Sequence, residues 1–169
     1  MNEIKEVFVE LDNAIASENA LRDSMGGLEL RNATIRILGQ MSLLLNDSVS
    51  RQINLFATQD VDAHVLGESF VVHTFKKLLE DRGLEFDFLS TEIWLPSDAT
   101  YIPVYEGDKL RCEILDPISA LVSKAVKAPE KNRLLIRSAL EIYGEDLAER
   151  IKKHGGDISV FQQTQKLRF

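Results

Sequence analysis

The sequence predicts an α/β (α+β) domain: a small mixed β-sheet with helices packed on it and a helical extension at its C-terminal end. Two patterns lead to this expectation. Up to residue 115, segments of alternating apolar side chains are interspersed with amphipathic helices, whereas residues 116–154 show helical periodicity alone. The 169 residues suffice for one domain with a substantial core. We therefore expect a single domain over 1–169, with a sheet core over 33–115, a helical part over 116–154 and a tail over 155–169.

The first half of the chain alternates helices and strands. Residues 3–15 carry apolar side chains at helical spacing, and residues 33–38 form a β-branched, alternating strand. A glycine turn at Gly39 then opens a short apolar helix. A second strand is expected over 60–65 and a helix over 68–82, which Gly83 ends.

The second half begins with strands and becomes helical. Residues 84–88 alternate as a strand, and residues 101–105 and 109–114 read as a hairpin with Gly107 in its turn. Pro103 places its strand at a sheet edge. Helices are expected over 117–127, 129–143 and 145–154, with Asp116 as the N-cap of the first. The tail contains apolar residues that would dock on the body or on another subunit: Val160, Phe161, Leu167 and Phe169.

Composition restricts the class of protein. With 44% hydrophobic and 28% charged residues, the chain is neither disordered nor embedded in a membrane. The absence of a spanning apolar run and of a signal layout predicts a cytoplasmic protein without a membrane partner. Cys112, the only cysteine, is expected to be a small buried hydrophobe. The net charge of −7 opposes a broad nucleic-acid surface. Several basic residues nevertheless crowd one region, either as a phosphate-binding lip or as solvated helix faces: Lys124, Lys127, Lys131, Arg133 and Arg137.

The most informative feature is a pair of carboxylates one residue apart, Asp60 and Asp62. On a strand these side chains project from one face together with His64. Two like charges side by side on a sheet face are unfavourable unless a divalent cation such as Mg²⁺ lies between them. A metal site is therefore one interpretation; the other is a chance Asp-x-Asp in a turn or at a loop edge.

A phosphate-binding turn is predicted upstream of this pair. The strand over 33–38, Gly39 and the following helix together direct free backbone N–H groups and the positive end of a helix dipole at the turn. Arg51 and Thr58 lie between this turn and the two aspartates.

These residues resemble the nucleotidyltransferase superfamily, in particular its small bacterial branch, which includes toxin components of toxin–antitoxin pairs. The resemblance rests on the Gly39 turn, on Ser50-Arg51 and Thr58 before Asp60-Val61-Asp62, and on the segment 115–125 with Pro117, Leu121 and Lys124. It implies a nucleotidyltransferase-like fold in which Asp60 and Asp62 hold Mg²⁺ or Mn²⁺. It also implies that an NTP such as ATP contacts Gly39, Gln40, Ser42, Arg51 and Lys124. Glu113, on a strand expected to lie beside the aspartates, is the candidate third carboxylate for catalysis.

The sequence departs from the family at two places. Gln40 replaces the second glycine of the turn, and the segment 131–138 keeps basic residues but lacks the family's acids. Two functions therefore stay open. One is metal-dependent transfer of a nucleotidyl group from an NTP to an unknown acceptor hydroxyl on RNA, protein or a small molecule. The other is a catalytically decayed module that binds nucleotide or a protein partner.

Two further alternatives concern the roles of His64 and Trp94. A metal-dependent hydrolase would use Asp60, Asp62 and His64, although no second histidine has ligand spacing to support it. Trp94 would either cover a nucleotide base or plug the core near an edge.

Overall fold

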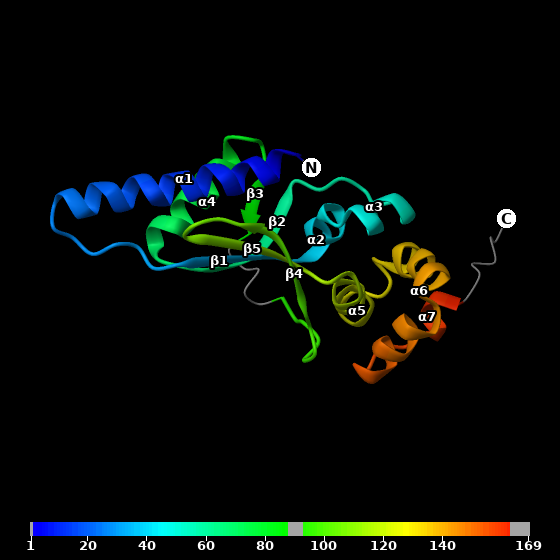
Figure 1. The fold of residues 1–169 in the computed structure, drawn as a ribbon. Helices are drawn as coiled ribbons and strands as arrows, with labels where there is room; N and C mark the ends of the chain where they lie inside the picture. The colour runs from blue at the N-terminus through cyan, green and yellow to red at the C-terminus, as the bar shows by residue number, and fades with distance from the viewer. Residues whose placement is uncertain (1, 88–92, 163–169) are drawn as a thin grey trace.

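The computed structural model describes residues 2–87 and 93–162 (Figure 1). Five strands form one sheet in the order β3-β2-β1-β5-β4. β1 pairs antiparallel with β2 and parallel with β5, β2 pairs parallel with β3, and β4 pairs antiparallel with β5. The predicted mixed sheet with flanking helices is therefore confirmed. The strands are β1 (Ala33–Ile37), β2 (Asp60–Leu66), β3 (Glu85–Asp87), β4 (Tyr101–Glu106) and β5 (Leu110–Leu115).

Two helices cover one face of the sheet, α1 (Asn2–Ser24) and α4 (Ser69–Glu80) (Figure 1). The apolar side chains that the alternating strands direct to this face, among them Ile35 and Val61, are buried with Phe8 and Phe75 of the two helices. We refer to this packed set as the sheet core.

The remaining helices gather beyond the end of the sheet at which β1 and β5 finish (Figure 1). They are α2 (Gly39–Leu45), α3 (Asp47–Gln52), α5 (Pro117–Lys127), α6 (Arg133–Lys153) and α7 (Ser159–Gln162). A second buried cluster joins them and includes Leu43, Leu121 and Phe161. We refer to it as the helical core. Because β1 and β5 are parallel, both strands deliver the chain to the same edge, where α2 and α5 begin.

Most predicted elements are present, with shifted ends. α1 continues to Ser24, well past residue 15, and α6 begins at Arg133 instead of 129. Gly144 interrupts α6 with φ +56°, so the predicted break there is confirmed as a kink. Residue 88 of the third strand, and Leu167 and Phe169 of the tail, lie outside the described residues.

The predicted hairpin forms, but its predicted neighbour is wrong. β4 and β5 pair as expected, and β4 with Pro103 is an edge strand. β5 does not lie beside the Asp60–Asp62 strand, because β1 is inserted between β2 and β5. Sequence periodicity specifies the strands and their faces. The order of the strands depends instead on how the segments that connect them pack on the sheet.

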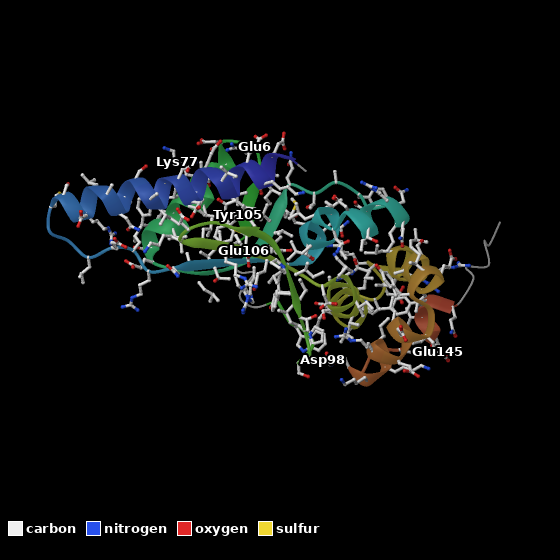
Figure 2. The ribbon with its side chains drawn as sticks, in the orientation of Figure 1. Glu6, Lys77, Asp98, Tyr105, Glu106 and Glu145 are labelled. Atoms are coloured by element: carbon white, nitrogen blue, oxygen red, sulfur yellow. The ribbon has the colours of Figure 1, made fainter. Side chains whose placement is uncertain are left out.

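The burial predicted for the single cysteine is confirmed. Cys112 is fully buried within the sheet core. Tyr105 of β4, labelled in Figure 2, donates from its hydroxyl to the Asp12 carboxylate of α1 at 3.1 Å, which ties the hairpin to the long helix. In the part of the chain that the structure describes, no helix is long and apolar enough to span a bilayer.

Candidate functional site

A cavity of about 760 Å³ opens where the sheet meets the helical core. Its size falls within the range of small-molecule sites. Residues of β2, β3, α2 and α5, of the loop before β2 and of the segment that enters α6 surround it. The lining residues are Gln40, Phe56, Ala57, Thr58, Asp60, Asp62, Glu85, Phe86, Lys124, Lys131, Asn132 and Leu135.

Carboxylates form one wall of this cavity. Asp60 and Asp62 project from β2 on the face opposite Val61 and Ala63, which are buried in the sheet core, as the alternation predicts. Glu85 of β3 pairs in register with Asp60 and lines the same cavity. Acidic side chains on adjacent strands repel each other in the absence of a counter-charge. We call Asp60, Asp62 and Glu85 the acidic wall.

Gly39 and Asp62 are fitted to each other. Gly39 has φ +58°, a conformation that other residues rarely adopt, and a Cβ on it would collide with Oδ2 of Asp62. The Leu38 amide also donates to the Asp62 carbonyl oxygen at 2.8 Å. The Asp62 carboxylate therefore lies against the first residue of α2, where the helix dipole favours negative charge.

Two lysines form another part of the cavity lining. Lys124 of α5 and Lys131, in the segment before α6, line the same cavity; we call this pair the basic wall. Burial lowers the pKa of Lys124, and the charge of Lys131 lowers it further, while Asp62 acts in the opposite direction. An anion bound between the two lysines would relieve both unfavourable effects.

Asn132 fixes the turn that carries the basic wall. Its side-chain amide donates to the carbonyl oxygens of Lys124 at 3.3 Å and Ala128 at 2.9 Å, and so satisfies carbonyls at the end of α5. The turn therefore has a defined geometry that places Lys131 near Lys124.

The loop that precedes β2 forms the rim of the cavity. Thr58 accepts a hydrogen bond at its hydroxyl from the Asp60 amide at 3.2 Å, which shapes the entry into the strand. Gln40 donates from Nε2 to the Phe56 carbonyl oxygen at 3.2 Å. The rim is thus connected to the first turn of α2.

Five of the eight sequence-predicted site residues come together here and three do not. Gln40, Asp60, Asp62 and Lys124 line the cavity, and Gly39 contacts Asp62. The other three lie away from its described lining: Ser42 is fully buried and donates to the Gly39 carbonyl oxygen, Arg51 is exposed in the last turn of α3, and Glu113 lies on β5.

Glu113 is occupied by arginines. Its Oε2 pairs with Nε of Arg36 at 3.0 Å and its Oε1 with Nε of Arg111 at 2.8 Å, while its side chain is almost fully buried. Both oxygens therefore take part in a structural ion pair on the sheet, with Arg36 also stacked over the Tyr101 ring at 4.5 Å. His64 pairs in register with Arg36 and is not among the residues that line the cavity.

Some lining residues were not predicted from the sequence. Glu85 pairs with Asp60 on the neighbouring strand, and the alternation of residues 84–88 was the signal that would have indicated its face. Lys131 lines the cavity and belongs to the basic cluster for which the sequence leaves two interpretations, a phosphate-binding lip or solvated helix faces. Asn132 had no local signal, because only the packing of α5 against α6 brings its turn to the cavity.

Asp116 and Trp94 have structural roles. Asp116 caps α5 by accepting from the Ser119 amide at 3.0 Å, as predicted, and also accepts from the Thr100 hydroxyl at 3.0 Å. Trp94 packs against the helical core, edge-on to His154 and beneath Lys127, and is not among the described cavity residues.

The donor set of the acidic wall suits a hard divalent cation that completes its coordination elsewhere. Within residues 2–87 and 93–162, no group of three or more His, Cys, Asp and Glu side chains is placed to hold a metal by itself. Mg²⁺ is commonly bound through one or two carboxylates together with substrate phosphates and water. Asp60 and Asp62 fit that mode, because the strand presents both to the same cavity that the lysines face.

Comparison of the chain with family models, with curated proteins and with solved structures finds no match.

Proposed function

We propose that this cavity binds a nucleoside triphosphate together with Mg²⁺ or Mn²⁺, and that the protein transfers the nucleotidyl group to an acceptor hydroxyl. The observation that carries the proposal is the presence of two carboxylates and two lysines in the lining of one cavity. A triphosphate needs cationic partners, and a cation bound to it needs carboxylates, so the two walls suit the two ends of one metal–triphosphate ligand.

Each wall has a distinct task in this proposal. Asp60 and Asp62 hold the cation, which when bound neutralises charge that develops on the triphosphate. Lys124 and Lys131 bind phosphate oxygens as point charges. The attacking acceptor oxygen forms a bond to the α-phosphorus, the bond between that phosphorus and the α–β bridging oxygen breaks, and pyrophosphate leaves.

The acceptor proton needs a base. Glu113 is not assigned this role, because arginines pair with both of its oxygens. Glu85 is assigned it instead, since it lines the cavity beside Asp60 and a carboxylate within reach of a hydroxyl can accept its proton.

Thermal unfolding with each common NTP, with and without Mg²⁺ or Mn²⁺, tests the binding step. A ligand that binds only the folded state stabilises it by about 2.7 kcal/mol at a hundred-fold excess over its dissociation constant. We expect a metal-dependent rise in melting temperature that D60N and D62N abolish, while D23N, which alters an exposed carboxylate of α1 away from the cavity, preserves it. Metal-dependent binding that survives both cavity substitutions would contradict the site.

A second candidate is a nucleotide-binding module without turnover. It is favoured by Gln40, whose side chain is engaged with the Phe56 carbonyl at the position where the family turn has glycine. Incubation with α-labelled NTP, Mn²⁺ and a mixture of RNA and protein acceptors separates the two functions. Labelled acceptor and released pyrophosphate support the transferase, whereas metal-dependent binding with neither product supports the module.

A further inference from the structure

One cavity residue, Phe56, is an exposed aromatic side chain that belongs to neither the acidic wall nor the basic wall. Phe56 lines the cavity and is 83% exposed, although the neighbouring Ile53 is buried and Leu55 packs against the helical core. A large exposed aromatic ring at the rim of a polar cavity is available for contact with a ligand. Phe86, the other aromatic residue of the lining, is already packed edge-on against Phe75 at 5.4 Å.

The backbone of Phe56 is held close to the acidic wall. The hydrogen bond from Gln40 to its carbonyl oxygen connects the rim to the first turn of α2. Gln40 follows Gly39, whose missing side chain leaves the space that the Asp62 carboxylate occupies. The backbone that carries the ring therefore belongs to the same local unit as the proposed metal ligands.

The amides of the cavity have partners within the protein. Asn132 directs its side-chain N–H groups at the carbonyls of Lys124 and Ala128, and Gln40 directs one at Phe56. Donors that could read the edge of a base are thereby partly consumed. Stacking on an aromatic ring, in contrast, tolerates any base because every base has a π-face.

We infer that Phe56 is the platform on which the base of the bound nucleotide stacks. This inference rests on the proposed function and adds a substrate preference to it: the site accepts all four common NTPs and binds purine nucleotides more tightly than pyrimidine nucleotides, because the larger ring system covers more of Phe56.

Calorimetric titration of the full chain in Mg²⁺ with ATP, GTP, CTP, UTP and inorganic tripolyphosphate tests the inference. We expect F56A to weaken ATP and GTP binding about 5- to 100-fold, with a smaller loss for CTP and UTP and no change for tripolyphosphate, which has no base. F56W should retain nucleotide binding. L134A is the matched control, because Leu134 is 77% exposed on α6 but is not among the residues that line the cavity.

The outcomes separate this inference from the proposed function. Equal affinity of the unmodified protein for ATP and tripolyphosphate, or F56A binding ATP as the unmodified protein does, would overturn the stacking platform and leave the metal–triphosphate site intact. Equal weakening of ATP and tripolyphosphate by F56A would also overturn it, because the ring would then only support the loop. Failure of the unmodified protein to bind either ligand would overturn the proposed function and the inference with it.

Discussion

The two walls of the cavity are built in different ways. The acidic wall lies on adjacent strands, so the hydrogen-bonded register of β2 and β3 fixes the spacing of Asp60 and Glu85. The basic wall lies at the end of α5 and in the turn before α6, so its position depends on helix packing and capping. The spacing of the acids is therefore a property of the backbone, whereas the placement of the lysines is a property of tertiary contacts.

An ion-pair cluster helps to hold the helical side. Asp98, labelled in Figure 2, lies beside the C-terminal half of α6. Its carboxylate oxygens contact side-chain nitrogens of Arg150 at 3.0 Å, Lys153 at 2.7 Å and His154 at 2.8 Å. Arg150 also approaches the α5 cap Asp116 at 3.9 Å. The segment that enters β4 is therefore fastened to the helices that carry the lysines.

The largest expected effect comes from removing one aromatic residue from each core. F75A in the sheet core and F161A in the helical core should each lower the free energy of unfolding by about 3–5 kcal/mol, because both rings are fully buried. Denaturant unfolding followed by far-UV circular dichroism and by Trp94 fluorescence measures this. The predicted single domain requires coincident transitions in both variants; an earlier fluorescence transition in F161A alone would show that the helical core unfolds separately.

The fit between Gly39 and Asp62 should give the next largest effect. G39A should lower the free energy of unfolding by about 2–4 kcal/mol, since alanine at φ +58° is strained by about 1–2 kcal/mol and its Cβ must also displace the Asp62 carboxylate. G26A is the matched control: Gly26 has φ +70° but nothing lies within 4 Å of an added Cβ. The difference between the urea midpoints of the two variants measures the effect of the collision alone. Equal losses of unfolding free energy in both variants would show that the Asp62 carboxylate moves aside freely.

Lys124 should show that the basic wall is arranged for a ligand and not for stability. Burial lowers its pKa, so the folded state holds the proton less tightly than the unfolded state. Its contribution to the free energy of unfolding is therefore unfavourable at neutral pH and improves as pH rises from the folded pKa to the unfolded value of about 10.4.

K124M should thus raise the melting temperature at pH 7 without ligand by about 2–4 °C, in the range of stabilising changes at functional positions. The gain should shrink as pH approaches 10. The same variant should lose the stabilisation by NTP and Mg²⁺. Differential scanning calorimetry at pH 7 and pH 10 measures the gain in melting temperature and its decrease with pH. A lower melting temperature of K124M at pH 7 would contradict the unfavourable burial of the charge.

The smallest expected effect is that of the Asp98 cluster. Its hydrogen bond with Lys153, followed by those with Arg150 and His154, holds the pKa of the Asp98 carboxyl well below its usual range. The resulting stabilisation is complete above the unfolded pKa of about 3.9 and is lost as pH falls from there toward the folded pKa. D98N should therefore lower the urea midpoint modestly at pH 7, with a difference from the unmodified protein that narrows below pH 4. A difference that does not change with pH would exclude the charge as its cause.

The sequence by itself determined the local elements and the faces of the strands. Alternation over 60–65 specified that Asp60 and Asp62 project together, away from Val61 and Ala63, because side chains in a strand alternate at every residue. Gly39 as a turn, Asp116 as a cap and Gly144 as a helix break followed equally from backbone chemistry that acts over a few residues.

Only the tertiary structure decided which of these residues meet. The insertion of β1 between β2 and β5 separates Glu113 from the aspartates and pairs it with Arg36, while β3 brings Glu85 beside Asp60. Packing of α5 against α6 likewise brings Lys131 to the cavity. Strand order and helix docking depend on the burial of apolar surface between segments far apart in the chain, and periodicity within a segment carries no information about its neighbours.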